Sequence, residues 1–413
     1  MKDIFEIARS VKSASATASL YSEAQRNQAI LNIAKALIEN KQKIAEENKT
    51  DIDRAIQSKL SPAMIDRLVL NEERIENLAS SVQSIAEQEA VVGKIVSEST
   101  RPNGLKVSKK RIPLGVIGII FESRPGVVID CAALAIKSGN GVLLKGGKEA
   151  AQTNTILGKI VKEAISNDIN PDLIEVLDST NREDIDKLLG MKEQIDLVIP
   201  RGGEGLIRHV HANAKMPVIA HFKGLCHTYI DKDADENKAI AIAVNAKLQR
   251  PGVCNSMETL LIHQDLSSDF RSRLFKELHL GGAELRLDSK LYIQYPQYQE
   301  ATEDDWQTEY LSSTLSVRMV SSLDEAIAHI REYGSGHTES IVSESRAAID
   351  TFINSIDSSC VTVNASSRFN DGGQLGLGAE LGISTTKFHA YGPMGAEEMT
   401  TTHFIVEGTG QIR

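Results

Sequence analysis

The sequence predicts an α/β protein with a doubly wound parallel sheet and a second α/β region. Between residues 112 and 226, short apolar runs alternate with helical patterns, as in strands joined by helices. After residue 226 a second region has helices and strands of its own. A chain of 413 residues is also too long for one ordinary core, so we expect more than one domain.

Residues 1–91 are predicted to be helical. Apolar side chains recur every three or four positions, which places them on one face of a helix. Two such faces are formed by Ile30, Ile33 and Leu37, and by Ile75, Leu78, Val82 and Ile85. Ser61 followed by Pro62 is typical of a helix N-terminus. These features indicate packing and carry no chemistry.

Residues 92–111 are predicted to form a hairpin, because two alternating runs flank a turn at 101–104. A lone hairpin is marginal in water, so either its own domain or a partner subunit must cover it. Residues 400–407 are predicted to close the chain as an extended segment.

Five strands are predicted in the first sheet, at 116–120, 142–144, 174–177, 195–199 and 218–220. Ligands of doubly wound sheets bind at the carboxyl ends of the strands. Lys145, Gly147 and Lys148 lie at one such end, and Gly202 and Gly203 precede a helix predicted at 205–214. A helix N-terminus binds phosphate, although a glycine pair is more often a tight turn and lysines more often a solvated edge. No G-x-G-x-x-G follows the first strand, so the common dinucleotide fingerprint is absent.

Cys254 lies in the segment LQRPGVCNSME, residues 248–258. A helix is predicted at 239–248 and a buried strand at 259–262, with Pro251 and Gly252 ending the helix. A cysteine on a loop between two rigid elements is suited to act as a nucleophile. The alternative is a buried cysteine that behaves as a small hydrophobic residue.

Further along, helices are predicted at 323–331 and 347–356, and a strand at 361–364. The strand leads into the segment ASSRFNDGGQ, residues 365–374, which is polar and rich in glycine. Such a loop is either a surface connection or a binding loop with several hydrogen-bond donors.

Composition excludes several classes of function. The net charge of −10 provides no basic excess for nucleic acid or an anionic membrane. We find no secretory signal and no apolar run of 18 residues. The four cysteines include no C-x-x-C pair, so neither a structural zinc site nor a disulfide framework is expected. We therefore expect a cytoplasmic protein.

Four motifs together resemble the gamma-glutamyl phosphate reductase family of the aldehyde dehydrogenase superfamily. They are RIPLGVIGIIFESRP at 111–125, IPRGG at 199–203, QRPGVCN at 249–255 and VNASSRFNDGGQLGLGAE at 363–380. The resemblance implies an aldehyde dehydrogenase-like fold. It assigns residues 1–91 and 112–226 to an NADP-binding domain and 227–388 to a catalytic domain. It assigns 92–111 and 389–413 to oligomerisation.

The resemblance implies NADPH-dependent reduction of L-glutamyl 5-phosphate to glutamate 5-semialdehyde, the second step of proline synthesis from glutamate. Cys254 falls on the superfamily's nucleophile, which would form a thioester and release phosphate. Ser123 falls where the superfamily has its oxyanion-binding asparagine, and nearby Arg124 is a second candidate for that role. His221 lies near the position of the superfamily's general base, whose loss fits an enzyme that must exclude water. We have no account of residues 221–225, which differ from the glycine-rich pattern expected of the family.

The same resemblance assigns the binding residues. Lys145 matches the lysine that binds the cofactor ribose, Lys148 favours NADP because a lysine can pair with a 2′-phosphate, and Glu309 matches a nicotinamide-ribose glutamate. The substrate loop contributes Ser366, Ser367 and Arg368, and Arg124 and Arg250 are further cations for anionic groups. Each arginine can equally form an ordinary ion pair, and His337 can be either catalytic or structural.

Other functions remain open at this stage. The chain can be an aldehyde dehydrogenase relative with a different substrate, a cysteine hydrolase that pairs Cys254 with His221 or His337, or a non-catalytic relative. The predicted strand-end residues argue against a hydrolase, which needs no nucleotide. The resemblance also implies a homodimer or homotetramer and raises the question of channelling from glutamate 5-kinase.

Overall fold

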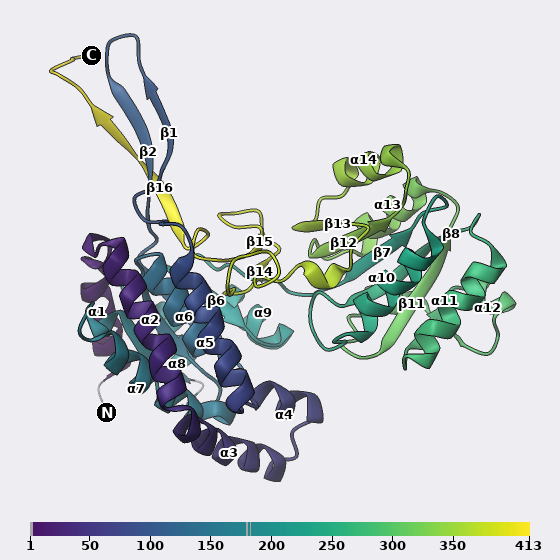
Figure 1. Ribbon diagram of the computed structural model, residues 1–413, viewed down its shortest axis with the longest axis horizontal. Coiled ribbons are helices and arrows are strands. Elements are labelled where there is room, and N and C mark those ends of the chain that lie inside the picture. The colour runs from purple at the N-terminus through teal and green to yellow at the C-terminus, as the bar shows by residue number, and fades with distance from the viewer. Residues whose placement is uncertain (1–2, 179–180, 182) are drawn as a thin grey trace. The chain divides into compact units, whose positions relative to one another are not determined.

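The computed structural model describes residues 3–178, 181 and 183–413, and its chain divides into two compact units. The first unit comprises Met1–Ala220, Gly376–Gly382 and Phe388–Arg413, and the second comprises His221–Leu375 and Ile383–Lys387. Figure 1 labels helices and strands of both units. The functional roles predicted for the domains remain predictions.

The first unit begins with the predicted helices. They are α1 (Ile4–Ser15), α2 (Glu23–Glu39), α3 (Lys41–Gln57), α4 (Pro62–Leu68) and α5 (Glu72–Glu87). The apolar residues predicted to share faces are buried, except that Leu78 is half-buried. Ser61 caps α4 by accepting a hydrogen bond from the backbone N–H of Met64. The helical period therefore predicted both the elements and their buried faces.

The sheet of the first unit is parallel, with strand order β5-β4-β3-β6. Its strands are β3 (Val116–Phe121), β4 (Gly141–Lys145), β5 (Ile174–Leu177) and β6 (Leu197–Arg201). The helices that join or follow them are α6 (Val127–Lys137), α7 (Ala151–Ile165), α8 (Glu183–Gly190) and α9 (Glu204–Asn213). Apolar clusters on the two faces pack against α2, α5, α6 and α7 and against α1, α8 and α9. The doubly wound topology is confirmed.

The predicted fifth strand at 218–220 is wrong. Within the described part of the chain, Val218 forms only an isolated parallel bridge to Val198 of β6. A strand needs a neighbour along several residues, and the short apolar run lies between Pro217 and the half-buried His221.

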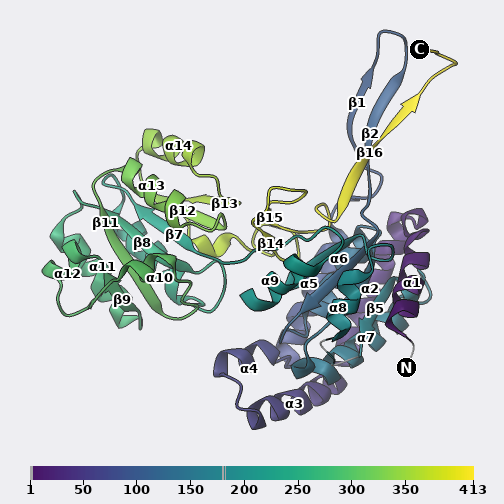
Figure 2. The ribbon, with the colours of Figure 1, turned by 180° about the vertical axis from the view of Figure 1, so that it is seen from behind.

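A second, antiparallel sheet in the first unit confirms the predicted hairpin. It is formed by β1 (Ile95–Thr100), β2 (Lys106–Pro113) and β16 (Thr400–Glu407), in the order β1-β2-β16. Figures 1 and 2 show this sheet extending away from the helices of its unit, with the C-terminus beside the hairpin turn. Every residue of β1 is exposed, and Phe404 and Val406 of β16 are 68% and 58% exposed. The first unit also holds the short strand β15 (Gly392–Pro393).

The second unit is built on another parallel sheet, with strand order β10-β9-β11-β8-β7-β12-β13. The strands are β7 (Cys226–Ile230), β8 (Met257–His263), β9 (Glu284–Leu287), β10 (Gln299–Glu300), β11 (Thr314–Val320), β12 (Thr338–Val342) and β13 (Cys360–Val363), with β14 (Ile383–Ser384) apart. One face packs against α10 (Glu236–Leu248), α11 (Ser268–Leu280) and α12 (Ser289–Gln294), and the other against α13 (Leu323–Tyr333) and α14 (Arg346–Ser355). The helices and strands predicted from residue 239 onward are therefore confirmed. Among the described residues of both units, no helix has the length and apolarity to span a membrane.

Candidate active site

Cys254 lies on the predicted loop, between the end of α10 and the start of β8. The side chain is half-buried, whereas the neighbouring Asn255 is buried. Two imidazoles accompany the thiol: the ligand atoms of His221, His337 and Cys254 all lie within 4.8 Å of one another. The two imidazole rings meet edge to face, with their centroids 5.6 Å apart. A thiol beside two imidazoles is the arrangement that activates a cysteine nucleophile.

Sheet topology brings these three residues together from positions far apart in the sequence. His221 precedes β7, Cys254 precedes β8, and His337 immediately precedes β12. Strands β8, β7 and β12 are neighbours and run parallel, so their amino ends lie at one edge of the sheet. The cluster therefore occupies the edge opposite to the carboxyl ends where ligands of doubly wound sheets are expected.

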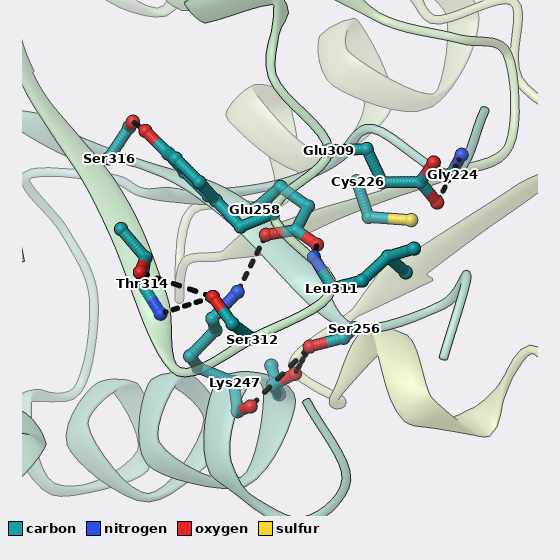
Figure 3. Close-up of polar contacts among 12 residues, drawn as sticks. Gly224, Cys226, Lys247, Ser256, Glu258, Glu309, Leu311, Ser312, Thr314 and Ser316 are labelled. Atoms are coloured by element: carbon teal, nitrogen blue, oxygen red, sulfur yellow. Dashed lines mark hydrogen bonds and ion pairs between the residues drawn. The ribbon is translucent and has the colours of Figure 1, made fainter. Parts of the chain in front are cut away.

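The backbone around Cys254 is held by an unusually close contact with Gly224. A Cβ atom placed on Gly224 would lie only 2.1 Å from the carbonyl oxygen of Cys254, so no larger residue fits. The N–H of Gly224 donates to Glu309 Oε1 at 2.9 Å, and the thiol of Cys226 donates to the Cys254 carbonyl at 3.1 Å. Burial raises the pKa of the Cys226 thiol, which keeps it protonated as a donor. Figure 3 shows Glu309 reaching Gly224 beside Cys226.

Residues 221–225, which differ from the pattern expected of the family, contribute twice to the surroundings of Cys254. The segment supplies His221 to the cluster and Gly224 to the backbone of Cys254. Glu309, predicted to bind the nicotinamide ribose, fixes this segment through Gly224. Its cofactor role stays a prediction.

The predicted substrate loop is joined directly to the residue after Cys254. Ser367 Oγ donates to the backbone carbonyl of Asn255 at 2.7 Å, and Asn255 Nδ2 donates to the carbonyl of Asn370 at 2.9 Å. Ser366 Oγ accepts from the N–H of Arg368 and so caps the short 3₁₀ turn Ser367–Phe369. Both serines are buried; the Ser366 hydroxyl bonds within the loop, whereas the Ser367 hydroxyl ties the loop to Asn255. Their substrate-binding role stays a prediction.

Arg368 carries a positive charge into the region of Cys254. Its Nε donates to Gln249 Oε1 at 2.9 Å. Burial lowers the pKa of Arg368, and Arg250 lowers it further, whereas Asp371 and the cysteines Cys254 and Cys226 raise it. A pocket of about 260 Å³ lies beside Arg368, lined by Asn245, Gln249, Phe369, Asp371 and Gln374. Arg368, Arg250 and Cys254 are therefore electrostatic neighbours in the second unit.

A buried ion pair that was not predicted from the sequence connects the two elements that flank the Cys254 loop. Lys247 Nζ lies 2.6 Å from Glu258 Oε2, and both side chains are fully buried. Glu258 Oε1 accepts a hydrogen bond from the N–H of Leu311 at 3.2 Å, as Figure 3 shows. Burial raises the pKa of Glu258 to about 7 and lowers the pKa of Lys247. The pair joins α10 to β8, the two elements between which Cys254 lies.

The sequence held one signal for this pair. Lys247 follows the alanine-rich stretch of residues 239–246, and Glu258 interrupts a largely apolar strand eleven residues later. A charged residue in a buried position requires a partner, so the two could have been matched.

In the first unit, the predicted cofactor residues lie at the carboxyl end of β4. Lys145 is buried, its Nζ donates to the Gly146 carbonyl at 3.1 Å, and burial lowers its pKa. Lys148 is exposed at the start of a short 3₁₀ turn. The carboxylate of Glu149 lies close to Gly147: a Cβ atom added to Gly147 would be 2.3 Å from Glu149 Oε2. Glu149 adjoins the predicted residues and was missed.

The predicted phosphate site at Gly202 and Gly203 already holds an anionic group of the chain itself. Glu122 Oε2 accepts a hydrogen bond from the N–H of Gly203 at 2.9 Å, at the N-terminus of α9. A Cβ on Gly202 would lie 2.5 Å from the same oxygen. A phosphate can bind here only if the Glu122 carboxylate moves away.

Ser123, the predicted oxyanion donor, has the features of a functional position. Its backbone φ is +44°, a left-handed conformation that is uncommon outside glycine. The residue is only 4% exposed, and its hydroxyl has no hydrogen-bond partner among the described residues. A strained backbone and an unsatisfied buried hydroxyl both occur at binding sites. The adjacent Arg124 is half-buried.

Comparison with known proteins gives the family. The model of the aldehyde dehydrogenase family matches residues 1–291. The chain belongs to the aldehyde dehydrogenase family.

Within this family, close relatives share one name. A protein of Desulfotalea psychrophila named gamma-glutamyl phosphate reductase is 46% identical over 411 residues, covering 99% of this chain and 98% of its own length. A crystal structure of the gamma-glutamyl phosphate reductase of Thermotoga maritima is 39% identical, with a TM-score of 0.96 over the full length of both chains. The resemblance and the fold class predicted from sequence motifs are therefore confirmed.

A more distant family member confirms the fold alone. An acetylating aldehyde dehydrogenase from Geobacillus thermoglucosidasius is 17% identical, with a TM-score of 0.74 and complete coverage of both chains.

Proposed function

We propose that this protein reduces L-glutamyl 5-phosphate to L-glutamate 5-semialdehyde with NADPH and releases inorganic phosphate, as the second step of proline synthesis from glutamate. The observation that carries the proposal is the half-buried thiol of Cys254, which lies beside two imidazoles and is coupled electrostatically to Arg368. The name shared by relatives 46% identical over nearly the whole chain supports the same reaction.

Cys254 performs the covalent chemistry in this proposal. One of the two imidazoles accepts the thiol proton, and the thiolate attacks the acyl carbon and displaces phosphate. The product is a thioester on Sγ. Reduction of the thioester gives a thiohemiacetal, which returns the thiolate and releases the aldehyde. The tight contact with Gly224 keeps the backbone of Cys254 in place during these steps.

Negative charge develops on the former carbonyl oxygen in both addition steps, so donors must be ready to meet it. We assign the backbone N–H of Cys254 as one donor and the Ser123 hydroxyl as the other, since that hydroxyl is buried and unsatisfied among the described residues. Arg368 and Arg250 are assigned to the anionic groups of the substrate, because guanidinium groups bind carboxylates in a bidentate manner.

NADPH supplies the hydride when bound. The residues at the carboxyl end of β4 suit a dinucleotide. Gly146 and Gly147 have no side chains to keep a ligand away from the backbone, and Lys145 and Lys148 lie beside them. Lys148 is exposed and can pair with a 2′-phosphate, whereas the Glu149 carboxylate favours ribose hydroxyls. The preference for NADP rests on Lys148.

We further propose that the chain acts as a dimer or tetramer through the sheet β1-β2-β16, whose exposed Ile95, Phe404 and Val406 would be covered by a neighbouring subunit. The four cysteines are free, which suits a reducing compartment such as the cytoplasm. Transfer of substrate from glutamate 5-kinase would shorten the exposure of the acyl phosphate to water.

The reverse reaction tests the proposal. Reduction of NADP by glutamate 5-semialdehyde should require inorganic phosphate, because phosphate is the acceptor that resolves the thioester. Equal rates with and without phosphate would mean that water resolves it, and the protein would then be a hydrolytic aldehyde dehydrogenase.

A further inference from the structure

We propose that the second unit contains a binding site for a thiophilic divalent cation such as Zn²⁺, formed by Cys254, His221 and His337. The ligand atoms of these three residues lie within 4.8 Å of one another. Thiolate sulfur and imidazole nitrogen are the donors that zinc prefers in proteins. Since no resident metal is needed by the proposed reaction, this cation would be a reversible occupant.

The geometry of the cluster is close to that of a tetrahedral zinc site. Zinc binds sulfur at about 2.3 Å and nitrogen at about 2.0–2.1 Å, which places ligand atoms roughly 3.3–3.6 Å apart. The observed limit of 4.8 Å can be closed by small side-chain rotations of the half-buried His221 and Cys254. Three protein ligands leave a fourth position for water, as in catalytic zinc sites.

Contacts around the cluster orient one of the imidazoles for a cation. Nδ1 of His337 hydrogen-bonds with Thr338 Oγ1 at 2.7 Å, so Nε2 is assigned as the ligand atom. Thr338 Oγ1 in turn accepts from Asn370 Nδ2 at 2.8 Å. Metal-binding histidines commonly use their second nitrogen in this way, which fixes the ring and its tautomer.

The other contacts hold the ligands before any cation arrives. His337 is fully buried, and the backbone of Cys254 is fixed by Gly224 and by the thiol of Cys226. His221 lies on the same segment as Gly224, three residues earlier. A site whose ligands are already positioned loses less conformational entropy on binding.

Coordination deprotonates the thiol of Cys254 and leaves the oxidation state of its sulfur unchanged. The Sγ–H bond of Cys254 breaks, a sulfur–metal bond forms, and one proton is released to solvent for each cation bound. The bound thiolate can no longer attack an acyl carbon, so the cation inhibits. Inhibition rests on the proposed function, whereas binding and proton release do not.

The test is a titration of the full-length protein with Co²⁺, followed by displacement with Zn²⁺. We expect one equivalent to bind with thiolate-to-cobalt charge-transfer absorption, and one proton to appear in a weakly buffered solution with a pH indicator. His221→Asn removes a direct ligand and should weaken binding by at least about 100-fold, the upper end of what losing an outer-shell partner costs a metal site. Cys360→Ser, which removes a half-buried thiol outside the cluster, should bind like the wild type.

Because His337 is buried and its variants can misfold, alkylation of Cys254 in the folded Cys360→Ser protein provides a second arm and should abolish the absorption. The inference is overturned if Co²⁺ gives no thiolate band, if alkylation leaves that band unchanged, or if His221→Asn binds as tightly as the wild type. Inhibition by Zn²⁺ that is reversed by a chelator supports the site and the function together. Binding by a protein that fails the phosphate test would sustain the site and refute only the function.

Discussion

Replacing Gly224 by alanine should disable the enzyme while leaving it folded. The added Cβ would lie 2.1 Å from the carbonyl oxygen of Cys254, 2.7 Å from its Cα and 2.8 Å from its carbonyl carbon. All three are backbone atoms, so no side-chain rotation relieves the clash. Ordinary contact begins at 3.4 Å, so the two segments must separate by about 1.3 Å. A misplacement of about 1 Å can cost about 100-fold in rate, and overpacking costs about 1–3 kcal/mol of stability.

We therefore expect kcat of Gly224→Ala to fall by about 100-fold, with a stable folded protein in thermal denaturation. Gly252→Ala is the matched control, because its added Cβ would meet nothing closer than the Leu311 carbonyl at 3.7 Å. It lies on the same loop as Cys254 and should keep most of the activity. Normal turnover by Gly224→Ala would refute the claim that this contact positions the nucleophile.

Three further changes test other parts of the account. Burial raises the pKa of Glu258 to about 7 from 4.5, so the folded protein keeps a proton that the unfolded chain releases. The free energy of unfolding should therefore fall by up to about 3 kcal/mol as pH rises from about 4.5 to 7. Glu258→Gln should flatten this pH dependence in denaturant titrations. Lys148→Ala should reduce the ratio of kcat/KM for NADPH over NADH by about 10-fold, and an unchanged ratio would contradict the role of Lys148. Phe404→Asp should lower the molar mass measured by sedimentation, because it places a charge on the exposed face of β16 that we propose is covered by a neighbouring subunit. A wild-type protein that sediments as a monomer would contradict the proposed interface.

The sequence predicted what depends on local patterns. The helices of residues 1–91, the hairpin and the loop of Cys254 were predicted correctly because each has its own periodicity or turn residues. The strand at 218–220 was not, because three apolar residues suffice to suggest a strand but only pairing with β6 makes one. Local preference and tertiary pairing disagree there.

The composition of the site was predicted better than its geometry. Cys254, His221 and His337 were all candidates, yet only the order β8-β7-β12 brings them to one edge of the sheet. Local patterns do not encode strand order. The same limit hid the pairing of Lys247 with Glu258, whose partners lie on different elements.

The strand ends of the first unit show a different limit. Gly202 and Gly203 are predicted to hold phosphate, a role that stays a prediction, and in the structure the carboxylate of Glu122 accepts the N–H of Gly203. Helix N-termini attract any anion, including one supplied by the chain. Sequence spacing alone does not distinguish the two.

Intact mass spectrometry of the acylated enzyme tests the central claim most directly. Enzyme mixed with glutamate 5-semialdehyde and NADP, without phosphate, should accumulate one glutamyl group per chain, located on Cys254 by peptide mapping. Cys254→Ala should remain unmodified under the same conditions. Phosphate should then discharge the adduct far faster than water does. An enzyme that turns over without any adduct on Cys254, or an adduct that water removes as fast as phosphate, would contradict the account.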